Sequence, residues 1–336
     1  MNEIRFDGSV LSPLVGHPAS PSTVTSGQGG HDAGGAGAPT LSDMRTRNLG
    51  NDTVGRHQVG AIGMGLMTMS QDGEPPRQQL LDTVTAALEA GVTLFDTADA
   101  YGQGTAGEQA MGQNERLIAG LLDELGVRSE VVLATKAGHT RGEDGSWGLD
   151  SRPEYLREAA EASLARLGVE QIQLWQHHRP DPECDYRATM EALREVADSG
   201  IVAMVGISNA DPEQIRTAHD VLGDRLVSVQ NQFSPKFRSS APEIEVCTEL
   251  GLAFLPWSPL GGLNEAKELA EKHPAFTEVA DERGVSPQQV ALAWELAQSE
   301  VVIPIPGAKR PQSITDSAAA AEIDLTDREL ERLDAS

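Results

Sequence analysis

Short apolar stretches alternate with amphipathic stretches from about residue 47 to the C-terminus. Between the apolar stretches, apolar residues recur every three to four positions, the spacing that places them on one face of a helix. The apolar stretches have strand length, and most of them are apolar on both faces, which is typical of buried parallel strands. The predicted strands are Val59–Gly63, Thr93–Asp96, Val131–Lys136, Ile172–Trp175, Val202–Ile207, Leu226–Gln230, Leu252–Pro256 and Val301–Ile305.

The starts of the intervening helices show capping chemistry, in which a small polar residue accepts hydrogen bonds from free N–H groups of the first turn. Ser151 and Glu154 have the spacing of a capping box, and Gly168 would end the helix that follows. Further predicted starts are Asp211-Pro212, Ser286-Pro287 and Thr326 with Glu329.

A strand–helix unit repeated eight times predicts an α/β fold, a parallel eight-stranded (β/α)8 TIM barrel over residues 46–336. Residues 1–45 are rich in Gly, Ser, Pro, Ala and Thr, so we expect a disordered or poorly ordered N-terminal extension there. The alternative is a doubly wound open sheet. Its dinucleotide fingerprint requires a third glycine that Gly63-Met-Gly65-Leu-Met-Thr68 lacks.

Composition narrows the class of protein. The chain has 336 residues, 39% of them hydrophobic, and contains neither an apolar run of membrane-spanning length nor a secretory signal, so we expect no membrane association and a cytoplasmic location. A net charge of −25 argues against nucleic acid as a partner. Cys184 and Cys247 suit a reducing compartment. A closed barrel leaves no free sheet edge, so we expect a monomer.

Polar residues follow successive predicted strands, and the active sites of such barrels lie at the C-terminal ends of the strands. Any one of these residues alone has a structural explanation as a cap, a surface cation or a packed ring. Together they would meet in one pocket. They are Asp96 and Tyr101 after the second strand, Lys136 at the end of the third, His177 and His178 after the fourth, Ser208 and Asn209 after the fifth, Gln230 ending the sixth, and Trp257 and Ser258 after the seventh.

The phenol, ammonium and carboxylate of this set form a chemically consistent group. A free tyrosine, with a pKa of about 10, exchanges protons slowly near neutrality, and a neighbouring cation such as Lys136 would lower that pKa. A buried ammonium in turn needs a carboxylate partner, which Asp96 can supply.

The segments FDTADAYG, LATKAG, QHHRPDP, GISN and PWSPLGG resemble, in the same order, the motifs of the aldo-keto reductase superfamily, and the similarity extends from Arg47 to Ser336. The resemblance implies catalytic roles for Asp96, Tyr101, Lys136 and His178. In the family pattern the catalytic histidine directly precedes an arginine, which selects His178 and leaves His177 as the alternative.

The resemblance also implies a nicotinamide cofactor. Ser208, Asn209 and Gln230 match residues that bind its carboxamide, and Trp257 matches the aromatic residue that stacks on its ring, although packing in the core is the alternative for Trp257. Lys309 and Arg310, before a helix that starts near Gln312, favour NADPH over NADH. The full implied cofactor set is Gly65, Met67, Ser208, Asn209, Gln230, Trp257, Ser258, Leu260, Gly307, Lys309, Arg310 and Ser313.

The sequence departs from the family in two places. Ser313, Asp316 and Ser317 stand where relatives more often carry Arg or Gln, Glu and Asn. After Gly262, the longer loop of many relatives is missing. These departures predict altered adenosine contacts and a reduced clamp over the pyrophosphate.

The implied reaction is reduction of an aldehyde or ketone by hydride transfer from nicotinamide C4, with Tyr101 as the general acid and no metal. Substrate contacts are expected in the loop His139–Asp150, including Trp147, and at the aromatic residues Trp175, Phe233 and Phe237, with packing as the equal alternative for each. The alternative function is a redox-sensing regulatory subunit like the potassium-channel β-subunits. These carry asparagine at the histidine position, so His178 favours an enzyme.

Overall fold

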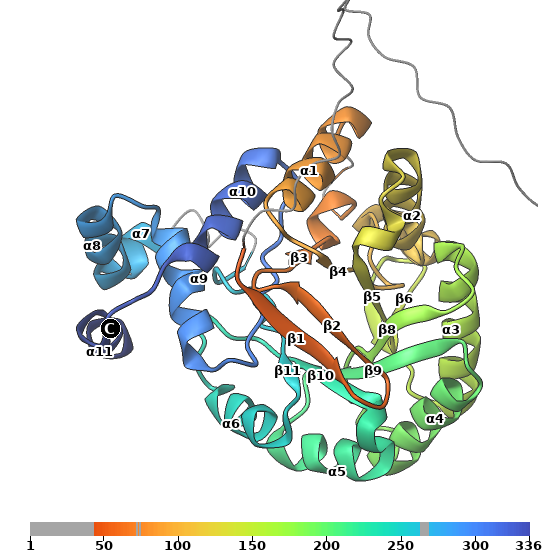
Figure 1. The fold of residues 1–336 in the computed structure, drawn as a ribbon. Helices are drawn as coiled ribbons and strands as arrows, with labels where there is room; N and C mark the ends of the chain where they lie inside the picture. The colour runs from red at the N-terminus through yellow and green to blue at the C-terminus, as the bar shows by residue number, and fades with distance from the viewer. Residues whose placement is uncertain (1–43, 72, 74, 263–268) are drawn as a thin grey trace, which may run out of the picture. The chain divides into compact units, whose positions relative to one another are not determined.

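The computed structural model describes residues 44–71, 73, 75–262 and 269–336 (Figure 1). Residues 1–43 of the predicted N-terminal extension lie outside the described residues. Met44 and Arg45, the last two residues of the predicted extension 1–45, are part of the barrel. Met44 is buried, and the Arg45 carbonyl accepts a 2.8 Å hydrogen bond from the Ala61 N–H. The Arg45 guanidinium also pairs with Asp324 at 2.6 Å.

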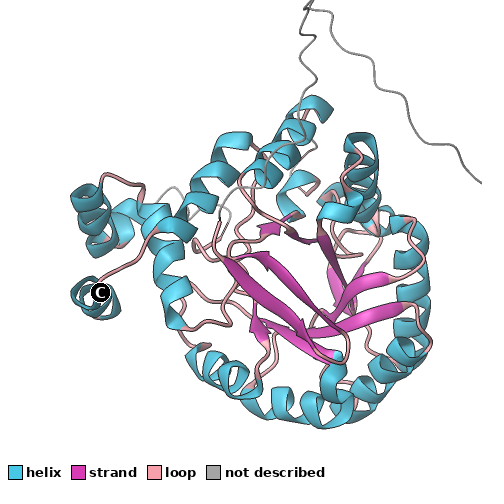
Figure 2. Cartoon of the chain, viewed as in Figure 1, coloured by secondary structure: helices cyan, strands magenta, loops and turns pink. Residues whose placement is uncertain are grey.

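The predicted parallel barrel is confirmed. Among the described residues, seven parallel strands form one curled sheet in the order β11-β10-β9-β8-β5-β4-β3, so each strand lies beside one that is near in sequence. Figure 2 shows the strands at the centre and the helices around them. These strands are β3 (Met64–Gly65), β4 (Leu94–Asp96), β5 (Val132–Ala137), β8 (Ile172–His177), β9 (Val202–Ser208), β10 (Leu226–Gln230) and β11 (Ala253–Phe254).

The predicted eighth strand, Val301–Ile305, closes the barrel without forming a regular ladder. On the β11 side, Ile303 and Ile305 donate backbone hydrogen bonds to the carbonyls of Phe254 and Pro256. On the β3 side, the carbonyls of Pro304 and Pro306 accept hydrogen bonds from Gly63 and Gly65. Proline has no N–H group, so at the boundary between Val301–Ile305 and β3, called the seam below, hydrogen bonds are donated from the β3 side only.

Helices surround the sheet, while α7, α8 and α11 lie outside this ring beside α9 (Figure 1). The helices are α1 (Arg77–Glu89), α2 (Gln113–Leu125), α3 (Pro153–Leu167), α4 (Tyr186–Asp198), α5 (Pro212–Leu222), α6 (Ala241–Leu250), α7 (Leu269–Lys272), α8 (Pro274–Arg283), α9 (Pro287–Gln298), α10 (Pro311–Ala319) and α11 (Asp327–Asp334). The larger apolar core lies between these helices and the outer face of the sheet.

Three of the four predicted helix caps are confirmed, at Asp211, Ser286 and Thr326. The capping box at Ser151 is wrong. The N-cap of α3 is Arg152, and the Ser151 hydroxyl instead lies 2.8 Å from His177 Nε2 in the interior. A buried imidazole needs a hydrogen-bond partner more than an exposed helix end does, because water can satisfy the latter.

An antiparallel hairpin of β1 (Thr46–Asn51) and β2 (Gly55–Gly60) covers the N-terminal end of the barrel. Leu49 and Val59 pack in one interior cluster with Leu94 and Val132, which are the first residues of their strands. The predicted strand Val59–Gly63 is therefore divided: its first two residues belong to the hairpin, and the barrel strand that follows is β3.

A second hairpin, β6 (His139–Arg141) and β7 (Trp147–Leu149), rises from the loop after β5 at the opposite end of the barrel. Arg141 pairs across this hairpin with Trp147, and the guanidinium carbon lies 4.1 Å from the indole centroid. The cation on the ring face stabilises the pair.

Candidate active site

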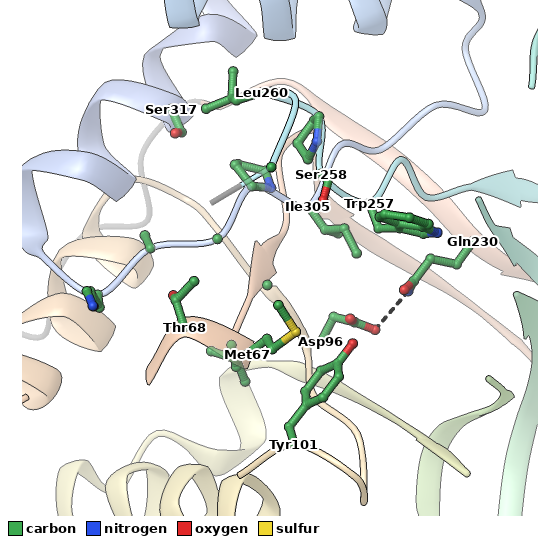
Figure 3. A pocket seen from close by; sticks show the side chains of 18 of the residues that line it. Met67, Thr68, Asp96, Tyr101, Gln230, Trp257, Ser258, Leu260, Ile305 and Ser317 are labelled. Carbon is green, nitrogen blue, oxygen red and sulfur yellow. Dashed lines mark hydrogen bonds between the residues drawn. The ribbon is translucent and has the colours of Figure 1, made fainter. Parts of the chain in front are cut away.

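A cavity of about 850 Å³ opens at the C-terminal ends of the strands, and every one of the implied cofactor residues lines it. Asp96, Tyr101 and His178 line the cavity as well. Figure 3 shows Tyr101 and Asp96 at one end and Leu260 and Ser317 at the other. The cavity is thus long enough to bring the predicted catalytic and cofactor residues to one space.

Lys136 lies beneath Tyr101 and is completely buried. Its Nζ donates hydrogen bonds to Asp96 Oδ2 at 2.6 Å, to the Thr97 carbonyl at 2.9 Å and to the Tyr101 hydroxyl at 3.3 Å. An ammonium without water must place all three of its N–H bonds on acceptors. The Tyr101 hydroxyl oxygen is one of those acceptors, so the hydroxyl proton of Tyr101 points away from Lys136.

The second oxygen of Asp96 is held by two amides. Gln176 Nε2 and Gln230 Nε2 each donate to Asp96 Oδ1 at 2.9 Å, and the bond from Gln230 is drawn in Figure 3. Gln176 was not predicted from the sequence. It reaches Asp96 because residue 206 is glycine: a Cβ there would lie 2.8 Å from Gln176 Cγ.

Burial is the largest influence on the phenol. It raises the pKa of Tyr101 above its ordinary value, while the charge of Lys136 and its hydrogen bond act in the opposite direction without reversing the shift. The predicted lowering influence of Lys136 is thus present, but burial outweighs it. Burial lowers the pKa of Lys136, but Asp96 and Tyr101 together raise it further, so the lysine is charged.

The two adjacent histidines lie in different environments. The His178 ring lines the cavity and packs edge-on against the Tyr101 ring, with centroids 5.6 Å apart. The His177 ring points into the interior towards Ser151 and Tyr186. Burial lowers the pKa of His178 well below its ordinary value, with Lys136 as the next cause, and burial lowers that of His177 to about 4. Both imidazoles are neutral near pH 7.

Ser208 and Asn209 are positioned by hydrogen bonds to their neighbours. The Ser208 hydroxyl donates to the Gln230 carbonyl at 2.6 Å, and Asn209 Nδ2 donates to the His178 carbonyl at 3.0 Å. Asn209 has a φ of +58° and Ser258 a φ of +51°, a left-handed conformation that is uncommon for residues other than glycine. Both residues line the cavity, where strained backbone is often found.

The donors and surfaces of the cavity fit a nicotinamide dinucleotide. Trp257 offers a flat indole surface, and its Nε1, like Thr68 Oγ1, is a buried polar atom without a partner among the described residues. At the far end, Arg310 is the N-cap residue of α10, and Lys309 precedes it. Two cations beside a helix N-terminus are suited to phosphate groups.

The departures noted at Ser313 and Asp316 lie at this same end. Asp316 accepts hydrogen bonds from the Ser286 hydroxyl at 2.9 Å and from Gln289 Nε2 at 2.7 Å. Its carboxylate is therefore held by the N-terminus of α9 on the wall of the cavity. Arg310 Nη2 donates to the Ser313 hydroxyl at 3.4 Å.

The predicted aromatic wall is only partly present. Trp147 lines the cavity, but Trp175, Phe233 and Phe237 are not among its lining residues. Trp175 is fully buried on the outer face of β8, because side chains alternate along a strand and its neighbour Gln176 points inward. Phe233 stacks on Trp294 at 5.3 Å, and Phe237 is exposed. His139 lines the cavity beside Trp147.

Within the described ranges, no group of three or more His, Cys, Asp or Glu residues is placed to hold a metal ion. No described helix is both long and apolar enough to cross a membrane.

A protein-family model for the aldo/keto reductase family matches residues 61–336. The chain belongs to the aldo/keto reductase family. The sequence-based assignment is thus confirmed, and the protein is a member of an oxidoreductase family.

Relatives of this aldo/keto reductase cover most of the chain. An uncharacterised oxidoreductase of Schizosaccharomyces pombe is 31% identical over 297 residues, covering 87% of this chain and 92% of the relative. A 6-dehydroglucose reductase of Novosphingobium aromaticivorans is 33% identical over 287 residues, covering 82% and 90%. A solved aldo/keto reductase of Klebsiella pneumoniae, in complex with NADP and acetate, has a TM-score of 0.72 at 24% identity and covers 87% of this chain and 95% of that one.

Proposed function

We propose that this aldo/keto reductase reduces an aldehyde or ketone to an alcohol with NADPH as the reductant. The observation that carries the proposal is the Tyr101 hydroxyl, which lines the cavity and accepts a hydrogen bond from the buried Lys136. Family membership and the NADP bound to the Klebsiella neighbour support the cofactor. When bound, the dihydronicotinamide supplies the hydride.

Tyr101 protonates the substrate oxygen in this scheme. Lys136 occupies one lone pair of the phenol, so the O–H faces the cavity and can donate to a carbonyl oxygen. As negative charge develops on that oxygen, the phenolic proton moves to it, and the ammonium of Lys136 stabilises the phenolate that remains. Asp96 keeps the ammonium in place through its 2.6 Å contact.

His178 orients the substrate rather than transferring a proton. Its ring lies beside Tyr101, and its lowered pKa keeps it neutral, so it donates one N–H and accepts at the other nitrogen. A second hydrogen bond from this ring to the carbonyl oxygen would fix the direction of hydride attack.

Lys309 and Arg310 support NADPH as the preferred cofactor. Both line the distal end of the cavity, and neither forms an ion pair with an acidic side chain among the described residues. A 2′-phosphate would supply the charge-assisted hydrogen bonds that such cations form.

The direct test replaces Tyr101 with phenylalanine. We expect Tyr101→Phe to lose at least about 1,000-fold in turnover of a reactive aldehyde, because the proton donor is gone while the ring remains. The affinity for NADPH, measured by the quenching of protein fluorescence, should be nearly unchanged. Phe237→Tyr, at an exposed residue outside the cavity lining, serves as the control for protein preparation. Full turnover in Tyr101→Phe would exclude the mechanism.

A further inference from the structure

The end of the cavity that holds Tyr101 and His178 carries an unbalanced positive charge. Arg179 lines the cavity there, directly after His178 in sequence. Within the described part of the chain, the carboxylates that line the cavity are Asp96 and Asp316. Asp96 is neutralised by Lys136, and Asp316 is held at the distal end by Ser286 and Gln289.

Among the described residues, no acid forms an ion pair with Arg179. Asp181, two residues further on, accepts hydrogen bonds from the backbone N–H groups of Ser151 at 3.3 Å and Glu183 at 3.0 Å. Asp150 pairs with Arg152 at 2.6 Å. Arg179 has neither an ion pair nor a side-chain hydrogen bond among the described residues, so its five N–H donors are available to a ligand.

The guanidinium is close enough to act on the neighbouring imidazoles. Burial is the main cause of the lowered pKa values of His139 and His178, and the charge of Arg179 contributes to both. Because Lys136 contributes to the same shifts, the two histidines stay neutral, and with Lys136 paired to Asp96 the charge left at this end is that of Arg179.

Part of the cavity wall at this end is built by the β6–β7 hairpin, through His139 and Trp147. His139 packs edge-on against His178, with ring centroids 4.4 Å apart, and edge-on against Trp147 at 5.3 Å. The Nδ1 atom of His139 lies 3.1 Å from the Gly148 carbonyl, which fixes the ring. Trp147 is braced from behind by Arg141, so the hairpin presents a rigid aromatic surface to a short ligand.

We propose that this enzyme selects short carbonyl substrates that carry a carboxylate, and that Arg179 is the residue that recognises it. The inference rests on the proposed reductase function and adds the substrate class. We place the carboxylate a few carbon atoms from the carbonyl group, because His178 and Arg179 are consecutive and both line this end of the cavity. The Arg fork can bind the carboxylate through two parallel hydrogen bonds.

The test compares succinate semialdehyde with its uncharged methyl ester, methyl 4-oxobutanoate, at saturating NADPH. We expect the wild-type kcat/KM to favour the acid by about 10-fold or more, the usual effect of a charge-assisted hydrogen bond. Arg179→Gln should lower kcat/KM for the acid by roughly 10- to 100-fold, chiefly through KM, and leave the ester within about 3-fold. Arg179→Lys should restore part of the preference.

Arg216→Gln is the matched control, since Arg216 is an exposed arginine on α5 that pairs with Glu249 far from the cavity lining. It should leave both substrates unchanged. Equal use of acid and ester by the wild type, or an acid preference that survives in Arg179→Gln, would overturn the inference while leaving the reductase function intact.

A result in which no carbonyl compound is reduced would instead contradict the proposed function. The two failures are separated by calorimetric titration with 4-hydroxybutanoate in the presence of NADP⁺. Binding that is lost in Arg179→Gln and retained in Arg216→Gln would still support the carboxylate site. Absence of binding to the wild-type protein would overturn it.

Discussion

At the scale of single residues, the centre of the site is the carboxylate of Asp96. It accepts hydrogen bonds from side chains on three other strands: Lys136, Gln176 and Gln230. The sequence predicts that Asp96, Lys136 and Gln230 converge, because each lies at the C-terminal end of a predicted barrel strand. Gln176 could not be recognised, because a glutamine within a strand looks like a surface residue until the barrel shows that its face is inside.

The choice between His177 and His178 shows the same limit. Residue types alone leave both open, and the family order of histidine before arginine favours His178. The alternation of side chains along β8 and past its end then places the His177 ring on the helix-facing side, against Ser151 and Tyr186, and the His178 ring in the cavity. The catalytic roles of these residues stay predictions.

The titration of the site predicts a flat pH profile. Reduction requires a protonated phenol, whose pKa is raised by burial, so activity is lost only as pH rises through a value above about 10. The neutral form of His178 is present above its lowered pKa, so no loss is expected near pH 6.5 either. We expect kcat/KM at saturating NADPH to be constant from about pH 6.5 to about pH 9. A basic limb with a midpoint near pH 8 would contradict this assignment.

At the scale of elements, capped helices are the most predictable feature and hairpins the least. Asp211, Ser286 and Thr326 carry their capping information locally. The strands of β1 and β2 are rich in polar residues, and their burial depends on the barrel end that they cover, so no local pattern reveals them. The β6–β7 hairpin likewise depends on the pairing of Arg141 with Trp147.

The helix α9 contains a buried acid with a testable consequence. Glu295 is fully buried, and neither of its carboxylate oxygens has a partner among the described residues, so burial raises its pKa well above the ordinary value. The carboxyl is neutral in the folded protein and ionises in the unfolded chain above about pH 4.3. Stability is therefore greatest below that pH and declines as pH rises towards the folded pKa.

We expect Glu295→Gln to be more stable than the wild type at pH 8, by a margin that shrinks towards pH 5. The difference should change by at most about 1.4 kcal/mol per pH unit. Urea unfolding at both pH values measures it, with Glu158→Gln on the exposed face of α3 as a control. A difference that does not depend on pH would show that Glu295 is ionised in the folded state.

At the scale of the whole molecule, the repeat of strand and helix is enough to predict a closed barrel, and closure then brings the strand ends together. What the repeat does not predict is how the barrel is closed at its N-terminal end. There the β1–β2 hairpin inserts Leu49, which is fully buried among the first residues of several strands. Stability and chemistry are thereby assigned to opposite ends of the barrel.

This separation predicts that Leu49→Ala destabilises the protein by about 2–5 kcal/mol without changing KM for a carbonyl substrate. The cost comes from a cavity left in the packed interior, and the active site is at the other end. Val54→Ala, on the half-buried turn of the same hairpin, should cost less than about 1 kcal/mol. Thermal unfolding and steady-state kinetics of both variants provide the comparison. A large rise in KM for Leu49→Ala would mean that the two ends are coupled.

The one-directional seam between Val301–Ile305 and β3 bears on how the barrel moves. The N–H groups of Gly63 and Gly65 donate across it to proline carbonyls. The prolines have no N–H group that could donate back to the β3 side. This boundary therefore has fewer cross-strand hydrogen bonds than a regular parallel ladder of the same length. The chain that leaves the seam continues into Gly307, Lys309 and Arg310, so a transient parting there would loosen the phosphate-binding end while the proton-transfer end stays rigid. We expect the residence time of the cofactor to be set at this boundary rather than by the residues that carry out the chemistry.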